Sequence, residues 1–168
     1  MLRFGGLMLA LLLVAQGRPA TGKVNSTFDK SADFKSLQTY GWIAGQNAFD
    51  PAAHKAIVAA IDAEMAALGL KKVEGRTGQV TVRYLAVRST SVDLDKLEQL
   101  ERKGADPAGA NVTVGRLIIA LEDAKSSRRL WAADSVEVVD PAAADREETV
   151  KRVVARMFET YPTRQKGR

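Results

Sequence analysis

The alternation of apolar and polar residues is clearest between Val114 and Val139. Residues 123–128 interrupt this pattern with polar side chains, and Asp and Ser suit a turn. Alternate residues of a strand point to the same side. The sequence therefore predicts a hairpin of two long strands whose buried side carries Leu117, Ile119, Leu121, Leu130, Val136 and Val138.

Three shorter segments are also rich in strand-forming residues, namely 23–28, 39–43 and 80–87. A helical pattern separates the second segment from the third. Two strands connected through a helix can pair in parallel by a right-handed crossover. We therefore expect segments 39–43 and 80–87 to be parallel neighbours in the sheet.

Two amphipathic helices are predicted, and each begins with an Asp-Pro pair. Aspartate is a good N-cap, and proline suits the first helical position. The first helix runs from Asp50-Pro51 to Gly69, and its apolar stripe is Ile57, Ile61, Met65 and Leu68. The second runs from Asp140-Pro141 to Pro162, and its stripe is Val150, Val153, Val154, Met157, Phe158 and Tyr161.

These elements predict an α+β fold, with a small mixed, mainly antiparallel sheet of about four strands and two main helices packed on one face. A chain of 168 residues suits one domain, which we place at residues 21–162. Residues 89–111 depart from the pattern, because Asp93 can cap only a short helix before a loop. This segment is either a surface excursion between strands or a mobile flap over a groove.

The N-terminal sequence has the pattern of a secretory signal. Arg3 precedes an apolar run from Leu7 to Ala15, and small residues follow at Ala15 and Gly17. This run is shorter than the roughly 20 residues of a membrane-spanning helix. We expect residues 1–20 to be a signal peptide and leader, cleaved after Gly17 or Ala20. The protein would then be exported to the periplasm or cell envelope, with membrane contact only if the segment is retained.

The chain has no cysteine, which excludes disulfides and a cysteine-linked lipid anchor. Its net charge is +5, falling to +4 after cleavage at Gly17 because Arg3 is lost, and to +3 after Ala20 because Arg18 is lost too. Residues 163–168 are predicted to be a disordered basic tail, in which Arg164, Lys166 and Arg168 are candidate contacts to an anionic polymer. Nucleic acid is not an expected partner of an exported protein.

No catalytic, cofactor-binding or metal-binding residue is predicted. His54 is the only histidine, and no Gly-x-Ser-x-Gly motif occurs. We expect His54 to pack at the edge of its helix. Acidic pairs that serve as caps, turns or helix N-termini stand at Asp93/Asp95, Glu122/Asp123 and Glu147/Glu148.

A partner surface is predicted on the hairpin side opposite Leu117 and Leu121. It consists of Arg116, Ile118, Trp131 and Glu137. Aromatic and arginine side chains are enriched at interaction hot spots. The alternative is that segment 89–111 or the N-terminal arm covers this patch, since large exposed apolar patches are uncommon on monomers.

Several fragments together resemble the bacterial domain-of-unknown-function 4136 family. They are Asp29–Trp42 (DKSADFKSLQTYGW), Leu68-Gly69, Val80–Tyr84, Leu117–Trp131 (LIIALEDAKSSRRLW) and Tyr161-Pro162. The resemblance covers roughly residues 24–162, and Asp123 and Trp131 match the family signature. It implies a small exported α+β domain, often lipid-anchored, and supplies no catalytic residue. The absence of cysteine departs from the lipoprotein pattern.

Three hypotheses about function follow. The first is an exported envelope protein with a non-catalytic binding or structural role, whose partner is another envelope protein. The second is a peripheral binder of anionic membrane or cell-wall polymer through basic residues. The third is a carboxylate-dependent hydrolase, because acidic residues distant in sequence can still meet in a fold.

Overall fold

The computed structural model describes residues 22–43, 48, 50–140 and 143–165. The predicted signal and leader, residues 1–20, and the tail residues Lys166 and Arg168 lie outside the described residues. Six strands form one sheet in the order β1-β6-β5-β4-β2-β3. Their bounds are β1 Val24–Phe28, β2 Thr39–Trp42, β3 Lys71–Val73, β4 Val80–Val92, β5 Asn111–Asp123 and β6 Arg129–Val138.

The sheet is mixed and mainly antiparallel, as predicted. The pairs β1–β6, β6–β5 and β5–β4 are antiparallel, whereas β2 pairs in parallel with both β4 and β3. The predicted parallel pairing of segments 39–43 and 80–87 is thus confirmed. The sheet has six strands instead of about four. Strand β3 escaped prediction because two of its three residues are exposed lysines and it has no apolar alternation.

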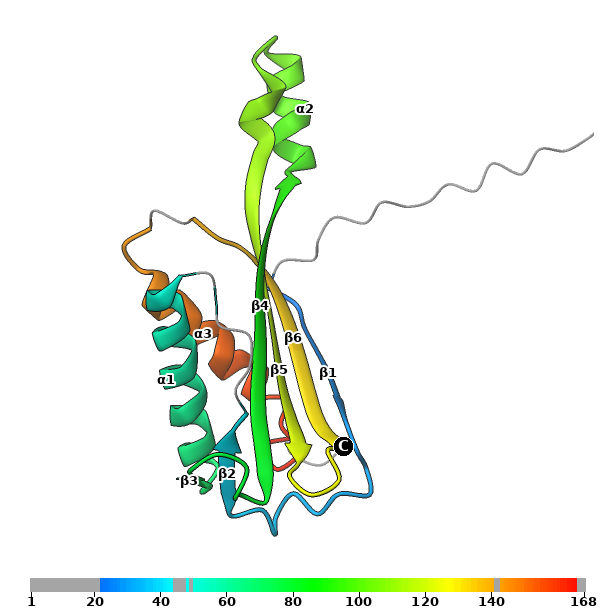
Figure 1. Ribbon diagram of the computed structural model, residues 1–168. Coiled ribbons are helices and arrows are strands. Elements are labelled where there is room, and N and C mark those ends of the chain that lie inside the picture. Colours follow the sequence, from blue (N-terminus) through cyan, green and yellow to red (C-terminus); the bar gives the residue numbers. More distant parts are fainter. Residues whose placement is uncertain (1–21, 44–47, 49, 141–142, 166–168) are drawn as a thin grey trace, which may run out of the picture.

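Helices α1 (Pro51–Ala67) and α3 (Arg146–Phe158) pack side by side on one face of the sheet (Figure 1). The Asp50 carboxylate accepts a hydrogen bond from the Ala52 amide at 2.8 Å, which confirms the predicted N-cap. Gly69 follows the C-cap of α1 and has a φ of +84°, a conformation that favours glycine.

The predicted start of the second helix at Asp140-Pro141 is wrong. Helix α3 begins six residues after Asp140, following Asp145. The Ala143 amide instead donates to the Asp140 carbonyl in a turn. The intervening alanines offer no large apolar side chain to bury against the sheet. Helix α3 instead starts about one turn before Val150, the first residue of the apolar stripe, and packing of that stripe supplies most of the helix stability.

One continuous apolar core joins these two helices to the sheet. Its largest fully buried side chains are aromatic, namely Trp131, Tyr40, Tyr161 and Phe158. A further helix, α2 (Leu94–Arg102), contributes no buried residue and stands apart from this core (Figure 1). Among the described residues, no helix is long and apolar enough to cross a membrane.

Candidate functional site

A long hairpin projects from the body of the protein (Figure 1). Strands β4 and β5 are paired along all 13 residues of each, from Val80 with Asp123 to Val92 with Asn111. The other strands pair only with the part of this hairpin nearer the body, at Val80–Val82 of β4 and Val114–Glu122 of β5. We call residues 89–113 the arm; they include α2 and the short 3-10 helix η1 (Pro107–Ala110).

Local hydrogen bonds order the tip of the arm. The Asp93 carboxylate accepts from the Lys96 amide at 3.1 Å and caps α2, as predicted. Gly104, at a φ of +62°, allows the chain to turn after α2, and Asp106 caps η1 through the Ala108 amide at 2.8 Å. The Asp93 amide then donates to the Ala110 carbonyl, which closes the tip. The arm is thus a folded extension that points away from the body, and it does not lie over a groove of its own chain.

A groove opens on the helix-covered side where the arm leaves the body. It encloses about 380 Å³ between the N-terminal ends of α1 and α3 and the adjoining strands. This volume falls within the roughly 300–1,000 Å³ of ligand pockets. Apolar side chains form its floor, namely Ala53, Ile57, Ala86, Leu117, Val150 and Val153. Three arginines and four carboxylates on the helix-covered side form its rim, namely Arg88, Arg146, Arg152, Asp50, Glu137, Asp140 and Asp145.

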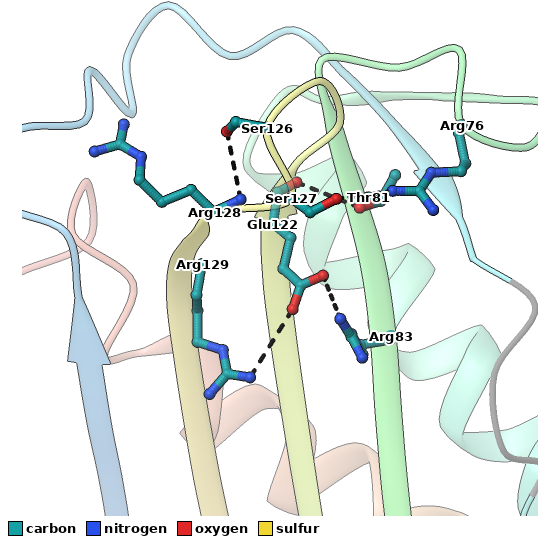
Figure 2. Close-up of polar contacts among 8 residues, drawn as sticks. All are labelled: Arg76, Thr81, Arg83, Glu122, Ser126, Ser127, Arg128 and Arg129. Atoms are coloured by element: carbon teal, nitrogen blue, oxygen red, sulfur yellow. Dashed lines mark hydrogen bonds and ion pairs between the residues drawn. The ribbon is translucent and has the colours of Figure 1, made fainter.

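Four arginines gather at the opposite end of the sheet, around the β5–β6 turn (Figure 2). We call Arg76, Arg83, Arg128 and Arg129 the arginine cluster. Glu122, 3% exposed, lies between two of them, 2.5 Å from the guanidinium of Arg83 and 3.9 Å from that of Arg129. One carboxylate thus balances two cations. The guanidinium of Arg76 donates to the Ser127 hydroxyl at 3.1 Å.

The β5–β6 turn is held by the Asp123 carboxylate. The hydroxyl and amide of Ser126 each donate to it at 2.7 Å. These hydrogen bonds, followed by that from the Lys125 amide and by the charge of Arg128, hold the pKa of Asp123 below its usual value. Arg128 itself forms an ion pair with Asp29. The turn is thus a rigid platform for the arginine cluster, and turn formation accounts for the match of Asp123 to the family signature.

The predicted partner surface is divided between two sides of the sheet. Arg116 and Ile118 lie on the side away from the helices, where Arg116 pairs with Asp134 at 3.2 Å. Trp131 and Glu137 face the helices instead. The Trp131 ring is fully buried, with its centroid 5.0 Å from that of Phe158, and Glu137 forms an ion pair with Arg156 of α3.

A β-bulge explains this correction. The ladder pairs Leu121 with Trp131 but Glu122 with Arg129, so Leu130 is an extra residue in β6. Both Leu130 and Trp131 are buried, and every later residue of β6 faces opposite to the prediction. Val138 is consequently 52% exposed instead of buried. Trp131 was the signal in the sequence for which residues of β6 face the core, because its large apolar ring favours a buried position.

The remaining residues named in the sequence analysis contact side chains of their own chain. Arg164 lies 2.5 Å from Glu64 of α1, so this part of the basic tail is engaged with the body. The His54 Nδ1 lies 2.5 Å from the Tyr84 hydroxyl at the edge of its helix. Glu147 and Glu148 both pair with Lys151 at 3.2 Å. In the described part of the chain, no three His, Asp or Glu side chains are arranged to hold a metal ion.

Sequence reasoning missed the groove and the arginine cluster, because both are assembled from distant segments. The arm left a signal: Leu94, Leu97 and Leu100 recur every three residues after a capping aspartate. This pattern showed a short amphipathic helix, but it did not show that the helix is carried away from the core by two long strands.

Solved structures share this fold at low sequence identity. A PDZ domain protein from Parabacteroides distasonis has a TM-score of 0.55 and 16% identity over 86% of this chain. The chain spans only 36% of that protein. The PelC dodecamer from Paraburkholderia phytofirmans has a TM-score of 0.52 and 11% identity, covering 80% of this chain and 93% of PelC. A variant of the same dodecamer has a TM-score of 0.52, 10% identity and coverages of 81% and 96%.

The chain has no match among curated protein sequences. It does match a described family over residues 24–163, which includes the sheet, α1, α3, the arm and the groove. This range agrees with the fragments on which the resemblance rested. The chain therefore belongs to the family described as domain of unknown function 4136 (DUF4136).

Proposed function

We propose that this protein is an exported cell-envelope protein that acts as a non-catalytic binding or structural module, and that the arm makes its principal contact. The signal-like pattern of residues 1–20 supports export. The observation that carries the binding role is the tip helix α2, which has no buried residue although it is ordered and carries three leucines. An ordered extension that adds nothing to the core suits contact with another molecule.

Deleting the arm tests this proposal. Replacement of residues 90–113 by an Asn-Gly turn joins Ser89 to Val114, which are paired in the ladder, and Asn-Gly favours a two-residue hairpin. The full chain and the shortened chain are each captured by a tag from the envelope fraction. We expect a stoichiometric partner, or a second copy, with the full chain only. Equal recovery of the same partners by both chains would contradict the proposal.

The mature N-terminus, read by mass spectrometry of the captured protein, tests the export step separately. We expect chains that begin at Arg18 or Thr21, because the small residues before these positions fit signal-peptidase cleavage. Recovery of the chain from the cytoplasm with Met1 or Leu2 at its start would overturn the proposed location.

The arginine cluster supports a second candidate function, peripheral binding to an anionic membrane or cell-wall polymer. Arg83, Arg128 and Arg129 have side chains that are 50%, 56% and 61% exposed. Exposed cations near an anionic surface contribute about 1 kcal/mol each and are screened by salt. This site differs from the predicted basic tail, in which Arg164 is paired with Glu64.

Vesicles that contain phosphatidylglycerol provide the assay for this second candidate. Replacing Arg76 and Arg129 by Gln should weaken binding about tenfold or more at 0.1 M salt, because two surface cations are lost. The matched control replaces Arg102 and Lys103 of the arm, which removes the same charge elsewhere. Equal binding by both variants would remove the arginine cluster from consideration.

A further inference from the structure

We propose that the tip helix α2 of one copy docks into the groove of a second copy, so that the protein assembles head to tail. This inference rests on the proposed role of the arm as a contact device and names its partner. The donor surface is the leucine side of α2, and the acceptor is the apolar groove between the N-terminal ends of α1 and α3. The contact belongs to the helix-in-groove class.

The donor surface is apolar and lacks cover within its own chain. Leu94 is 48% exposed and Val92, just before the helix, is 41% exposed. Leu97 lies one turn after Leu94 on the same side and is half-buried. Leu100 packs at the tip, because its methyl groups lie over Gly109. A short helix with one exposed and one half-buried leucine gains from burial in an apolar groove, at about 25 cal/mol for each Å² removed from water.

The two surfaces carry particular charges that can pair with each other. Residues 93–106, at the tip, contain five carboxylates and three cations, a net charge of −2 in a chain whose total is +5. In the described residues, Glu101 of α2 has no ion pair, and neither do Arg88 and Arg152 on the groove rim. Two rim carboxylates are already neutralised, Asp50 by Arg146 at 3.3 Å and Glu137 by Arg156. Arg88 and Arg152 therefore remain as rim cations without an ion pair, beside the carboxylates of Asp140 and Asp145, and they can pair with Glu101 of α2.

The arm cannot deliver its tip to its own groove. Arg88 lines the groove, and Leu94 lies six positions further along the chain, after strand β4 has continued to Val92. At about 3.3 Å per residue, the tip lies roughly 20 Å farther out. The contact must therefore form between copies. Because donor and acceptor surfaces differ, each copy can engage one neighbour by its tip and another by its groove, which generates a closed ring or an open filament.

Disulfide trapping tests this contact, because the chain has no cysteine of its own. Leu94→Cys is made in one tagged full chain and Ala53→Cys, on the groove floor, in another. A disulfide needs Cα atoms about 4.4–6.8 Å apart. We expect the mixture to give a cross-linked heterodimer under mild oxidation. The matched control uses Ala59→Cys, an exposed position on the same helix α1, in place of Ala53→Cys, and should cross-link at least tenfold less.

Exchange of opposite charges across the proposed contact provides a second test, read out as the strength of self-association. Glu101→Arg and Arg152→Glu should each weaken self-association about tenfold or more in sedimentation measurements, and chains that carry the two changes together should recover it. Recovery by the double variant would exclude misfolding as the cause of the single losses. Gln99→Arg, which adds a cation away from the leucines of α2, is the control and should leave association within twofold of the unchanged chain.

Three outcomes would overturn the inference. The first is a full chain that stays monomeric at high concentration and gives no Leu94→Cys/Ala53→Cys product above the control. The second is efficient cross-linking of Leu94→Cys to itself, which would indicate tip-to-tip pairing. The third is that residues 7–15 of the same chain occupy the groove and so protect a cysteine at position 53 from cross-linking. If the arm still captures a different envelope protein, the head-to-tail inference fails while the proposed function stands.

Discussion

Aromatic rings carry the contact between α3 and the sheet. Trp131 of β6 lies 5.0 Å from Phe158 and 5.7 Å from Tyr161 between ring centroids, and Phe34 packs edge-on against Tyr161 at 5.3 Å. Such pairs add about 0.5–1.5 kcal/mol each beyond their buried area. Residues from both ends of the chain thus meet around one tryptophan, and its loss should affect the whole body.

Trp131→Ala should reduce the free energy of unfolding by about 3–5 kcal/mol, because it leaves a large cavity in a packed core. Chemical denaturation followed by circular dichroism measures this loss. The matched control is Phe28→Ala, an aromatic residue of the neighbouring strand that is 38% exposed and should cost much less. A folded, equally stable Trp131→Ala protein that only lost a partner would contradict the buried position.

The buried hydroxyl of Tyr161 makes stability sensitive to alkaline pH. Burial raises the pKa of Tyr161 to about 12, whereas an unfolded tyrosine ionises near 10. Both states are protonated at pH 7, so no stability depends on this group there. Above pH 10 the unfolded chain loses its proton first, which favours unfolding by roughly 2 kcal/mol by pH 12.

Tyr161→Phe should remove this pH dependence. We expect the variant to match the unchanged protein near pH 7 and to lose less stability between pH 10 and 12, because phenylalanine has no ionisable group. Urea midpoints measured at pH 7 and pH 11 give the comparison. Burial and the Asp62 carboxylate, which accepts a hydrogen bond at 2.8 Å, also raise the pKa of Tyr40, so part of the alkaline loss should persist. An identical loss in both proteins would contradict the prediction.

At the scale of elements, close backbone approach fixes the position of β2, which lies between β4 and the edge strand β3. A Cβ atom at Gly41 would lie 1.8 Å from the carbonyl oxygen of Gly75, which is backbone and cannot rotate away. Gly41→Ala should therefore cost at least about 3 kcal/mol, at the upper end of overpacking effects. Gly109→Ala is the control, because its nearest contact is the flexible Leu100 side chain at 3.2 Å. Similar denaturation midpoints for both variants would show that β2 shifts freely.

Helices and strands with a regular apolar pattern could be predicted from the sequence. Features that depend on contacts with distant segments could not. The stripe from Ile57 to Met65 placed α1 correctly, and the alternation of Leu117, Ile119 and Leu121 placed β5. Strand β6 was assigned the wrong phase because a single extra residue, Leu130, reverses every side chain after it. The predicted cap of α3 was wrong because Asp-Pro is a local signal, whereas helix α3 begins about one turn before Val150, where its apolar stripe starts. The groove needs side chains from five elements, so no local pattern reveals it.

At the scale of the whole molecule, the protein has two parts that differ in how much apolar surface they bury. The body has one aromatic core under two helices, whereas the arm has two paired strands and a helix without buried residues. Local openings of such an extension need not break the core. Binding and release of the proposed partner by the arm would therefore not require the body to unfold.

Amide hydrogen exchange should separate the two parts. In dilute protein, amides of residues 89–113 should exchange through openings that cost much less than global unfolding, whereas those of Val82 and Ile119 should exchange only with global unfolding. If α2 docks in a neighbouring copy, protection of the arm should rise with protein concentration, since binding stabilises the bound form by mass action. The Glu101→Arg variant should lack this rise and keep the dilute pattern. Protection of the arm equal to that of the core at every concentration would mean that the molecule unfolds as one unit.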